Sequence, residues 1–134
     1  MAAVDWMVLC ESAFFDENGR LCLIGIARHF PVPSIPLLLF QHTLVAHLAD
    51  PLERKKLAVS FAVRTPSAVW VTPDETEATR ITMVDDYILI TLRNLPLKEE
   101  GLYRFGLSMN DEPAASLDIP VWIVPPRDGP LTLH

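Results

Sequence analysis

Apolar residues recur at every second position in several segments of this chain, and this period-two pattern constrains the fold more than any other feature. In a segment of about residues 40–48, His42, Leu44 and Ala46 fall on one face and Thr43 and Val45 on the other. Strand side chains alternate between faces, whereas helical residues repeat every 3.6 positions. We therefore predict an all-β, antiparallel Greek-key β-sandwich of about seven to nine strands, immunoglobulin-like or similar, with little or no helix.

The clearest predicted hairpin joins a strand of about residues 6–15 to a second strand of about residues 20–30. Asn18-Gly19 between them predicts a two-residue type I′ turn, which needs two positive φ values. In that register Cys10 faces Ala27 and Cys22 faces Phe15, so the two thiols point to different faces. Neither cysteine has a C-x-x-C context, and we expect both to be reduced and inert.

Two later segments bear on the topology. Residues 79–94 are compatible with one strand bulged at Asp85-Asp86 or with two strands joined there by a tight turn, and the pattern does not choose between them. Tyr103 enters an alternating strand after Gly101, which is typical of a tyrosine corner, although a core tyrosine after an ordinary glycine turn fits as well. Pro120 cannot donate to a ladder and predicts an edge or a break in the last strand.

Charge and hydropathy restrict the partners and the compartment that we expect. The net charge is −6 and the one basic run, Arg54-Lys55-Lys56, lies beside acidic residues, which disfavours nucleic acid and anionic membranes. The longest wholly apolar run, residues 37–40, is far too short to span a bilayer, and residues 6–10 are too short for a signal segment. We expect a cytoplasmic protein with one domain over residues 1–124 and an irregular tail over residues 125–134.

Residue types that carry chemistry are present but not grouped by spacing. His42 and His47 are five positions apart on one predicted strand, so they point to opposite faces and should not share a metal. No G-x-S-x-G, P-loop, G-x-G-x-x-G, H-E-x-x-H or EF-hand pattern occurs. The sequence therefore favours a protein that is not an enzyme and that has no catalytic residue, cofactor or metal, although a hydrolase site assembled from distant residues stays open.

Acidic loops supply a second hypothesis. Carboxylates gathered at one end of a sandwich can bind Ca²⁺, which prefers six to eight oxygen ligands. On this alternative the chain binds a small molecule or a divalent cation. The candidate residues are His47, Asp74, Glu75, Glu77, Asp85 and Asp86.

Several short motifs resemble a known family of small bacterial β-sandwich proteins, a domain of unknown function. They are Leu9-Cys10-Glu11, Asn18-Gly19-Arg20-Leu21, Ile24-Gly25-Ile26, Pro33-Ser34-Ile35-Pro36, Gly101-Leu102-Tyr103-Arg104-Phe105 and Ser116-Leu117. The resemblance covers about residues 6–124. It implies a sandwich and a bacterial origin, and it brings no catalytic or ligand-binding residue.

An apolar, proline-rich segment between Phe30 and Phe40 suggests an interface. Its prolines resist regular strand pairing while its apolar side chains need cover, and exposed apolar patches commonly mark interfaces. The bland alternative is that it wraps one open side of the sandwich. The candidate interface residues are Phe30, Val32, Ile35, Leu37, Leu38, Leu39 and Phe40. We expect a non-catalytic structural or protein-interaction module that forms a homo-oligomer or binds a protein partner.

Overall fold

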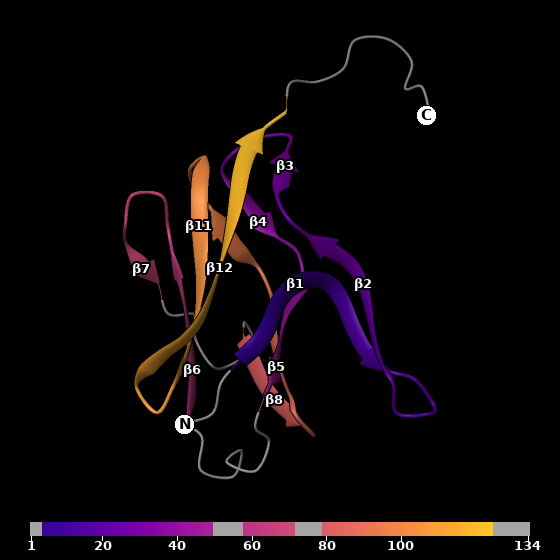
Figure 1. Ribbon diagram of the computed structural model, residues 1–134. Helices are drawn as coiled ribbons and strands as arrows, with labels where there is room; N and C mark the ends of the chain where they lie inside the picture. Colours follow the sequence, from indigo (N-terminus) through magenta and orange to yellow (C-terminus); the bar gives the residue numbers. More distant parts are fainter. Residues whose placement is uncertain (1–3, 50–57, 72–78, 125–134) are drawn as a thin grey trace.

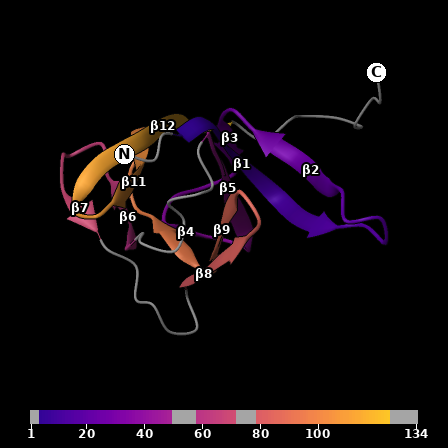
Figure 2. The same ribbon diagram turned by 60° about the horizontal axis from the view of Figure 1, so that its bottom comes forward.

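A computed structural model describes residues 4–49, 58–71 and 79–124, and all its regular elements are β-strands. Two five-stranded sheets lie in layers (Figures 1 and 2). The first sheet has the order β2-β1-β5-β9-β8, with β1 (Val4–Phe15), β2 (Leu21–Ala27), β5 (His42–Leu48), β8 (Thr79–Val84) and β9 (Tyr87–Leu92). The second has the order β3-β12-β11-β6-β7, with β3 (Phe30–Val32), β6 (Val59–Arg64), β7 (Trp70–Val71), β11 (Gly101–Met109) and β12 (Glu112–Ile123).

The sandwich predicted from the alternation is confirmed, although the described residues form twelve strands and not about seven to nine. The additional strands are short. A third, two-stranded sheet pairs β4 (Leu37–Leu39) with β10 (Leu95–Leu97). The surplus arises because segments without a long alternating pattern are recruited into sheets by distant neighbours.

Alternate positions of both large sheets fill one core between the layers. Leu44, Ala46 and Leu48 of β5 contribute from the first sheet, and Tyr103, Phe105, Leu107 and Met109 of β11 contribute from the second. Each of these residues is less than a tenth exposed. Burial of a large apolar side chain contributes about 1.5–3 kcal/mol. The inward-facing side chains of the period-two pattern therefore hold the two layers together.

The first hairpin differs from the predicted one by one residue of register. Phe14 lies opposite Cys22 and Cys10 lies opposite Ile26. Within the turn, Gly19 is the one residue with a positive φ, at 78°. The N–H of Asp16 donates to the carbonyl of Arg20. The connection is therefore a type I turn followed by a glycine bulge, which adds one residue to the loop.

The observed register places both cysteine side chains on the same face of the hairpin. Both thiols belong to the same alternating set of the hairpin, so the expectation that they point to different faces is wrong. Cys22 lies opposite Phe14, four positions from Cys10 along β1 and hence about 13 Å away. The thiols are kept apart by distance, and both are free.

Turns settle the topology that the sequence left open. Val84 pairs with Tyr87, so Asp85-Asp86 is a two-residue turn between β8 and β9 and not a bulge. The type I′ geometry occurs instead at Asn110 and Asp111, whose φ values are 54° and 64°.

The tyrosine corner is present. The hydroxyl of Tyr103 donates to the carbonyl of Glu99 over 2.8 Å and accepts from the Glu99 N–H over 3.3 Å. Pro120 stands where β12 changes from an edge strand into one flanked on both sides, because β3 pairs with β12 only from Val121 onward.

Candidate interaction surface and the His47 cluster

The distal half of the first hairpin extends beyond the rest of its sheet. β1 pairs with β5 over Val4–Cys10 and with β2 over Leu9–Phe15, so beyond Cys10 the strand has β2 as its one neighbour. We call residues 11–25 the arm. Figures 1 and 2 show it projecting from the body of the sandwich.

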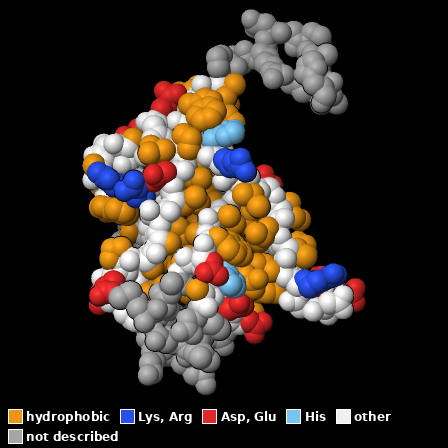
Figure 3. Space-filling view, in the orientation of Figure 1, with side chains coloured by type: hydrophobic (Ala, Val, Ile, Leu, Met, Phe, Trp, Pro, Cys, Tyr) orange, Lys and Arg blue, Asp and Glu red, His pale blue; other side chains and the backbone are white. Residues whose placement is uncertain are grey.

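One face of this hairpin carries four exposed apolar side chains. Positions directly opposite in an antiparallel pair share a face, and the register groups Trp6, Phe14, Ile24 and Ile26 on the same side. Their exposed fractions are 38%, 45%, 52% and 55%. We call these four residues the hairpin face. Figure 3 shows hydrophobic side chains gathered over β1 and β2.

Two glycines in left-handed conformations bracket part of β2. Gly19 ends the turn with a φ of 78°, and Gly25 interrupts the strand with a φ of 69°. A Cβ at Gly25 would lie 2.9 Å from side-chain carbons of Glu11, whereas nothing lies within 4 Å of one at Gly19. The Glu11 side chain thus crosses from β1 onto β2 at Gly25, which only a residue without a Cβ permits.

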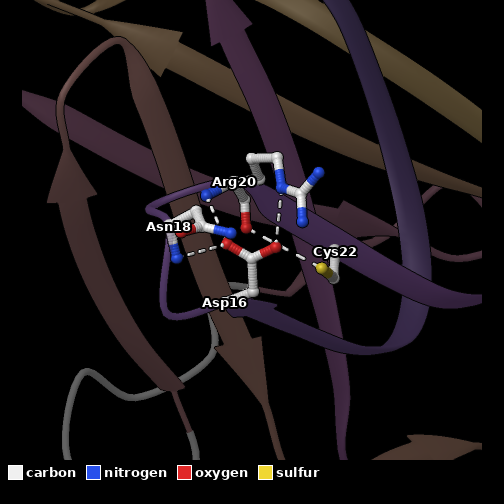
Figure 4. A network of polar contacts seen from close by, with 4 residues as sticks. All are labelled: Asp16, Asn18, Arg20 and Cys22. Carbon is white, nitrogen blue, oxygen red and sulfur yellow. Dashed lines mark hydrogen bonds and ion pairs between the residues drawn. The ribbon is translucent and has the colours of Figure 1, made fainter.

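The tip of the arm is tied by one carboxylate. Asp16 accepts hydrogen bonds from the N–H groups of Asn18 and Arg20 and from Nε of Arg20, over 2.8–2.9 Å (Figure 4). These contacts hold the pKa of Asp16 below its ordinary value, the Arg20 backbone bond being the largest cause. The Cys22 thiol lies 3.7 Å from the carbonyl oxygen of Arg20.

His47 lies between two carboxylates from different elements. Nδ1 is 2.9 Å from Asp5 at the start of β1, and Nε2 is 2.5 Å from Asp86 in the β8–β9 turn. Ionised carboxylates can only accept hydrogen bonds, so this geometry suits an imidazolium that donates from both nitrogens. The sequence argument placed His47 and Asp86 in one candidate group but gave no signal for Asp5.

Opposing effects set the charge of His47. Desolvation lowers its pKa, but the hydrogen bonds and negative charges of Asp86 and Asp5 together outweigh this, so the pKa lies above its ordinary value. Both ring nitrogens are engaged, and neither is open to a substrate. The cluster therefore links two strands, β1 and β5, to the β8–β9 turn.

Aromatic rings lie around the His47 cluster. Trp6 stacks on the His47 ring with centroids 5.7 Å apart and an interplanar angle of 10°. Tyr87 lies 5.0 Å from His47, and Phe15 at the far end of β1 contacts Tyr87 at 6.2 Å. His42 lies elsewhere, with Nδ1 3.1 Å from the Phe40 carbonyl oxygen and its ring 5.1 Å from Phe30. The two histidines do not share a site, as strand parity predicts.

A groove opens at the root of the arm. Its volume is about 510 Å³, and it is lined by Glu11, Ser12, Phe40, Gln41 and His42. Gln41 is oriented by Arg93, whose Nε donates to its side-chain oxygen over 3.2 Å.

The seven candidate interface residues between Phe30 and Phe40 are divided by the fold. Val32 and Leu39 are buried, while Phe30, Ile35 and Leu37 are half-buried against the core. Leu38 and Phe40 are 61% and 81% exposed. Most of the segment therefore wraps the sandwich, through β3 beside β12 and β4 beside β10. An interface role for these residues stays a prediction, and no residue of the hairpin face was among them.

The described residues do not form the cation site that the second hypothesis requires. Asp74, Glu75 and Glu77 lie outside residues 4–49, 58–71 and 79–124. Within those ranges no three His, Cys, Asp or Glu side chains are grouped so that they could hold a metal ion. In the same part of the chain, no helix is long and apolar enough to cross a membrane.

A family model described as a family of unknown function (DUF6941) matches residues 5–122. The chain belongs to this family. The match spans nearly every described strand of the DUF6941 domain, in agreement with the resemblance read from its motifs. No curated protein matches the DUF6941 chain.

Among solved structures, the DUF6941 domain is similar to the M1 domain from titin, with 11% identity and a TM-score of 0.36. That alignment covers 63% of this chain and 78% of the titin domain. The architecture given above rests on the strand pairing of this chain.

Proposed function

We propose that this domain is a non-catalytic protein-interaction module and that the hairpin face is its contact surface. The observation that carries the proposal is the exposure of Trp6, Phe14, Ile24 and Ile26 on one side of a hairpin. Monomers rarely expose contiguous apolar patches larger than a few hundred Å², and such patches commonly mark interaction sites.

The polar groups of the His47 cluster support this reading. Asp5, His47 and Asp86 engage one another and lie beside Trp6, at one end of the hairpin face. Interfaces combine an apolar centre with a polar rim. The arrangement thus has the composition of a contact surface, and its titratable groups are committed to structural contacts.

Charge substitutions on the hairpin face test the proposal. Ile24→Lys with Ile26→Lys removes two exposed apolar groups without opening the core, so the fold should be retained. We expect self-association, measured by sedimentation velocity across micromolar to millimolar concentrations, to weaken at least tenfold.

The matched control is Leu38→Lys, which places the same charge at an exposed leucine of the 30–40 segment. Loss of association with Leu38→Lys but not with the isoleucine pair would move the contact surface to that segment. A strict monomer at every concentration would remove self-association from the proposal.

Small-molecule binding is the second candidate, favoured by the groove at the root of the arm. Its lining combines one aromatic ring with a carboxylate, a hydroxyl, an amide and an imidazole, and polar groups of these kinds fix the orientation of a bound ligand. A ligand that binds only the folded state raises the melting temperature. A metabolite panel that stabilises the wild-type protein but not a Phe40→Ala, Gln41→Ala variant would support this alternative.

A further inference from the structure

The outer edge of β2 is the least protected strand edge in the described part of the chain. β2 spans seven residues, Leu21–Ala27, without a charge or a proline, and it pairs with β1 alone. The other edges carry devices that oppose pairing. β7 has two residues, β3 has three with Pro31 among them, β4 and β10 have three each with Pro96 in β10, and β8 contains Arg80. The open part of β12, residues 112–120, contains Pro113, Asp118 and Pro120, and the open side of β1 begins at Glu11. β6 is open only over residues 59–62.

The phase of the hairpin ladder shows which main-chain groups are open. The N–H of Asp16 donates to the carbonyl of Arg20, which makes residues 16 and 20 a hydrogen-bonded pair. Bonded and non-bonded pairs alternate along an antiparallel ladder. Cys22 and Ile24 therefore direct their main-chain groups toward β1, whereas Leu21 and Leu23 direct theirs toward the open edge.

The two left-handed glycines limit how much of this edge can pair. Gly19 and Gly25, with φ values of 78° and 69°, bracket the extended residues Arg20 to Ile24. Cys22 is the midpoint of that segment. A two-fold antiparallel pairing that uses the whole segment must therefore place Cys22 opposite Cys22 of the second copy.

We propose that two copies of this chain associate by antiparallel pairing of their β2 edges about a two-fold axis at Cys22, which joins the two first sheets into one. This inference rests on the proposed function and specifies its contact. Leu21 and Leu23 each exchange main-chain hydrogen bonds with Leu23 and Leu21 of the second copy. An unsatisfied strand edge has another strand as its natural complement, and an isologous contact closes at two subunits.

Side chains and charges are compatible with this register. Arg20 lies opposite Ile24 of the second copy, so no like charges face each other, and the Arg20 guanidinium already pairs with Asp16 over 2.8 Å. Phe14 and Cys22 share a face with Cys22 and Phe14 of the second copy, so the two hairpin faces become one apolar strip. Five paired residues bury less than the roughly 1,000 Å² of a stable interface, so the dimer should be weak and concentration-dependent.

Crosslinking through Cys22 tests the axis directly. In Cys10→Ser protein, copper phenanthroline should oxidise two Cys22 thiols to one disulfide, with two protons and two electrons passing to molecular oxygen. Opposed residues of a non-bonded antiparallel pair have Cα atoms about 4.5 Å apart, which suits a disulfide. We expect dimer to accumulate at least tenfold faster than in a Cys10→Ser, Cys22→Ser, Lys98→Cys control, whose thiol is at an exposed site in the connection between β10 and β11.

A backbone substitution separates this pairing from the general proposal. Leu23→Pro removes an outward N–H without removing a bond to β1, and Leu23→Ala changes the same side chain while keeping the N–H. Loss of association in Leu23→Pro alone, with an unchanged circular dichroism spectrum, supports the edge contact.

Other outcomes overturn it. Association that persists in Leu23→Pro but is lost with Ile24→Lys, Ile26→Lys leaves the hairpin face as a contact surface and rejects the strand pairing. Should Leu23→Pro fail to fold, crosslinking still decides, because Cys22 oxidation no faster than that of the Lys98→Cys control contradicts the axis.

Discussion

The hydroxyl of Tyr103 hydrogen-bonds both the carbonyl and the N–H of Glu99, four positions earlier in the chain. The ring is 1% exposed and belongs to the core, so this one side chain joins the turn before β11 to the packing between the layers. It supports the corner of the sandwich from inside.

Removing that hydroxyl should destabilise the fold. Tyr103→Phe leaves the half-buried Glu99 carbonyl without this donor, and a typical hydrogen bond contributes a net of about 0.5–1.5 kcal/mol. We expect the free energy of unfolding, measured with urea, to fall by that amount. Tyr87→Phe is the control, because Tyr87 is half-buried and makes ring contacts. Equal losses in the two variants would show that the corner bond adds nothing.

The arm should be sensitive to a methyl group at Gly25. Gly25→Ala must adopt a left-handed φ, at about 1–2 kcal/mol, and must also displace Glu11. Gly19→Ala bears the backbone cost alone, since the space around it is open. Thermal unfolding should therefore rank Gly25→Ala below Gly19→Ala, and adding Glu11→Ala should recover part of the difference. If the two alanine variants melt alike, Glu11 does not restrict this site.

Stability should depend on pH through His47. Its folded-state pKa is raised, so its contribution is fully present below the unfolded value of about 6.5 and is lost as pH rises through the folded-state pKa. We expect wild-type protein to lose stability relative to His47→Gln as pH increases from about 6 to 8. Asp86→Asn should weaken this dependence. Parallel pH profiles for wild type and His47→Gln would contradict the assignment.

The two thiols should react at very different rates. Cys10 is 0% exposed and lies 3.4 Å from the Thr43 carbonyl, and burial raises its pKa. Cys22 is only partly buried. An aromatic disulfide reagent should therefore titrate one thiol quickly in native protein, and Cys22→Ser should abolish the fast phase. Two fast thiols would mean that the arm opens at Cys10.

Much of the architecture was predictable because it depends on local patterns. Alternation identified the strands of both large sheets except β3, left open whether residues 79–94 are one strand or two, and parity separated His42 from His47. The hairpin at Asn18-Gly19 was located correctly, but its register was wrong by one residue because Asp16 organises a longer turn than the dipeptide alone implies. The type I′ turn lies at Asn110-Asp111, where both residues have positive φ values.

Features built from distant segments could not be predicted. The 30–40 segment has no alternating pattern, and it becomes ordered because β12 and β10 offer unpaired edges to it. Asp5, His47 and Asp86 come from two strands and a turn and form no motif in the sequence. The hairpin face was missed for a related reason, since an alternating strand does not reveal whether a second layer covers its other side.

Only two residues of β1 join the hairpin ladder to the rest of the first sheet. Leu9 and Cys10 alone in β1 are paired on both sides, with β2 and with β5, and both are fully buried. The arm is therefore anchored by strand pairing at these positions and by the contact of Phe15 with Tyr87 near its far end. Its direction is set by the volume packed beneath Cys10 and Leu9, so a substitution there would re-aim everything the arm touches while leaving its surface chemistry unaltered.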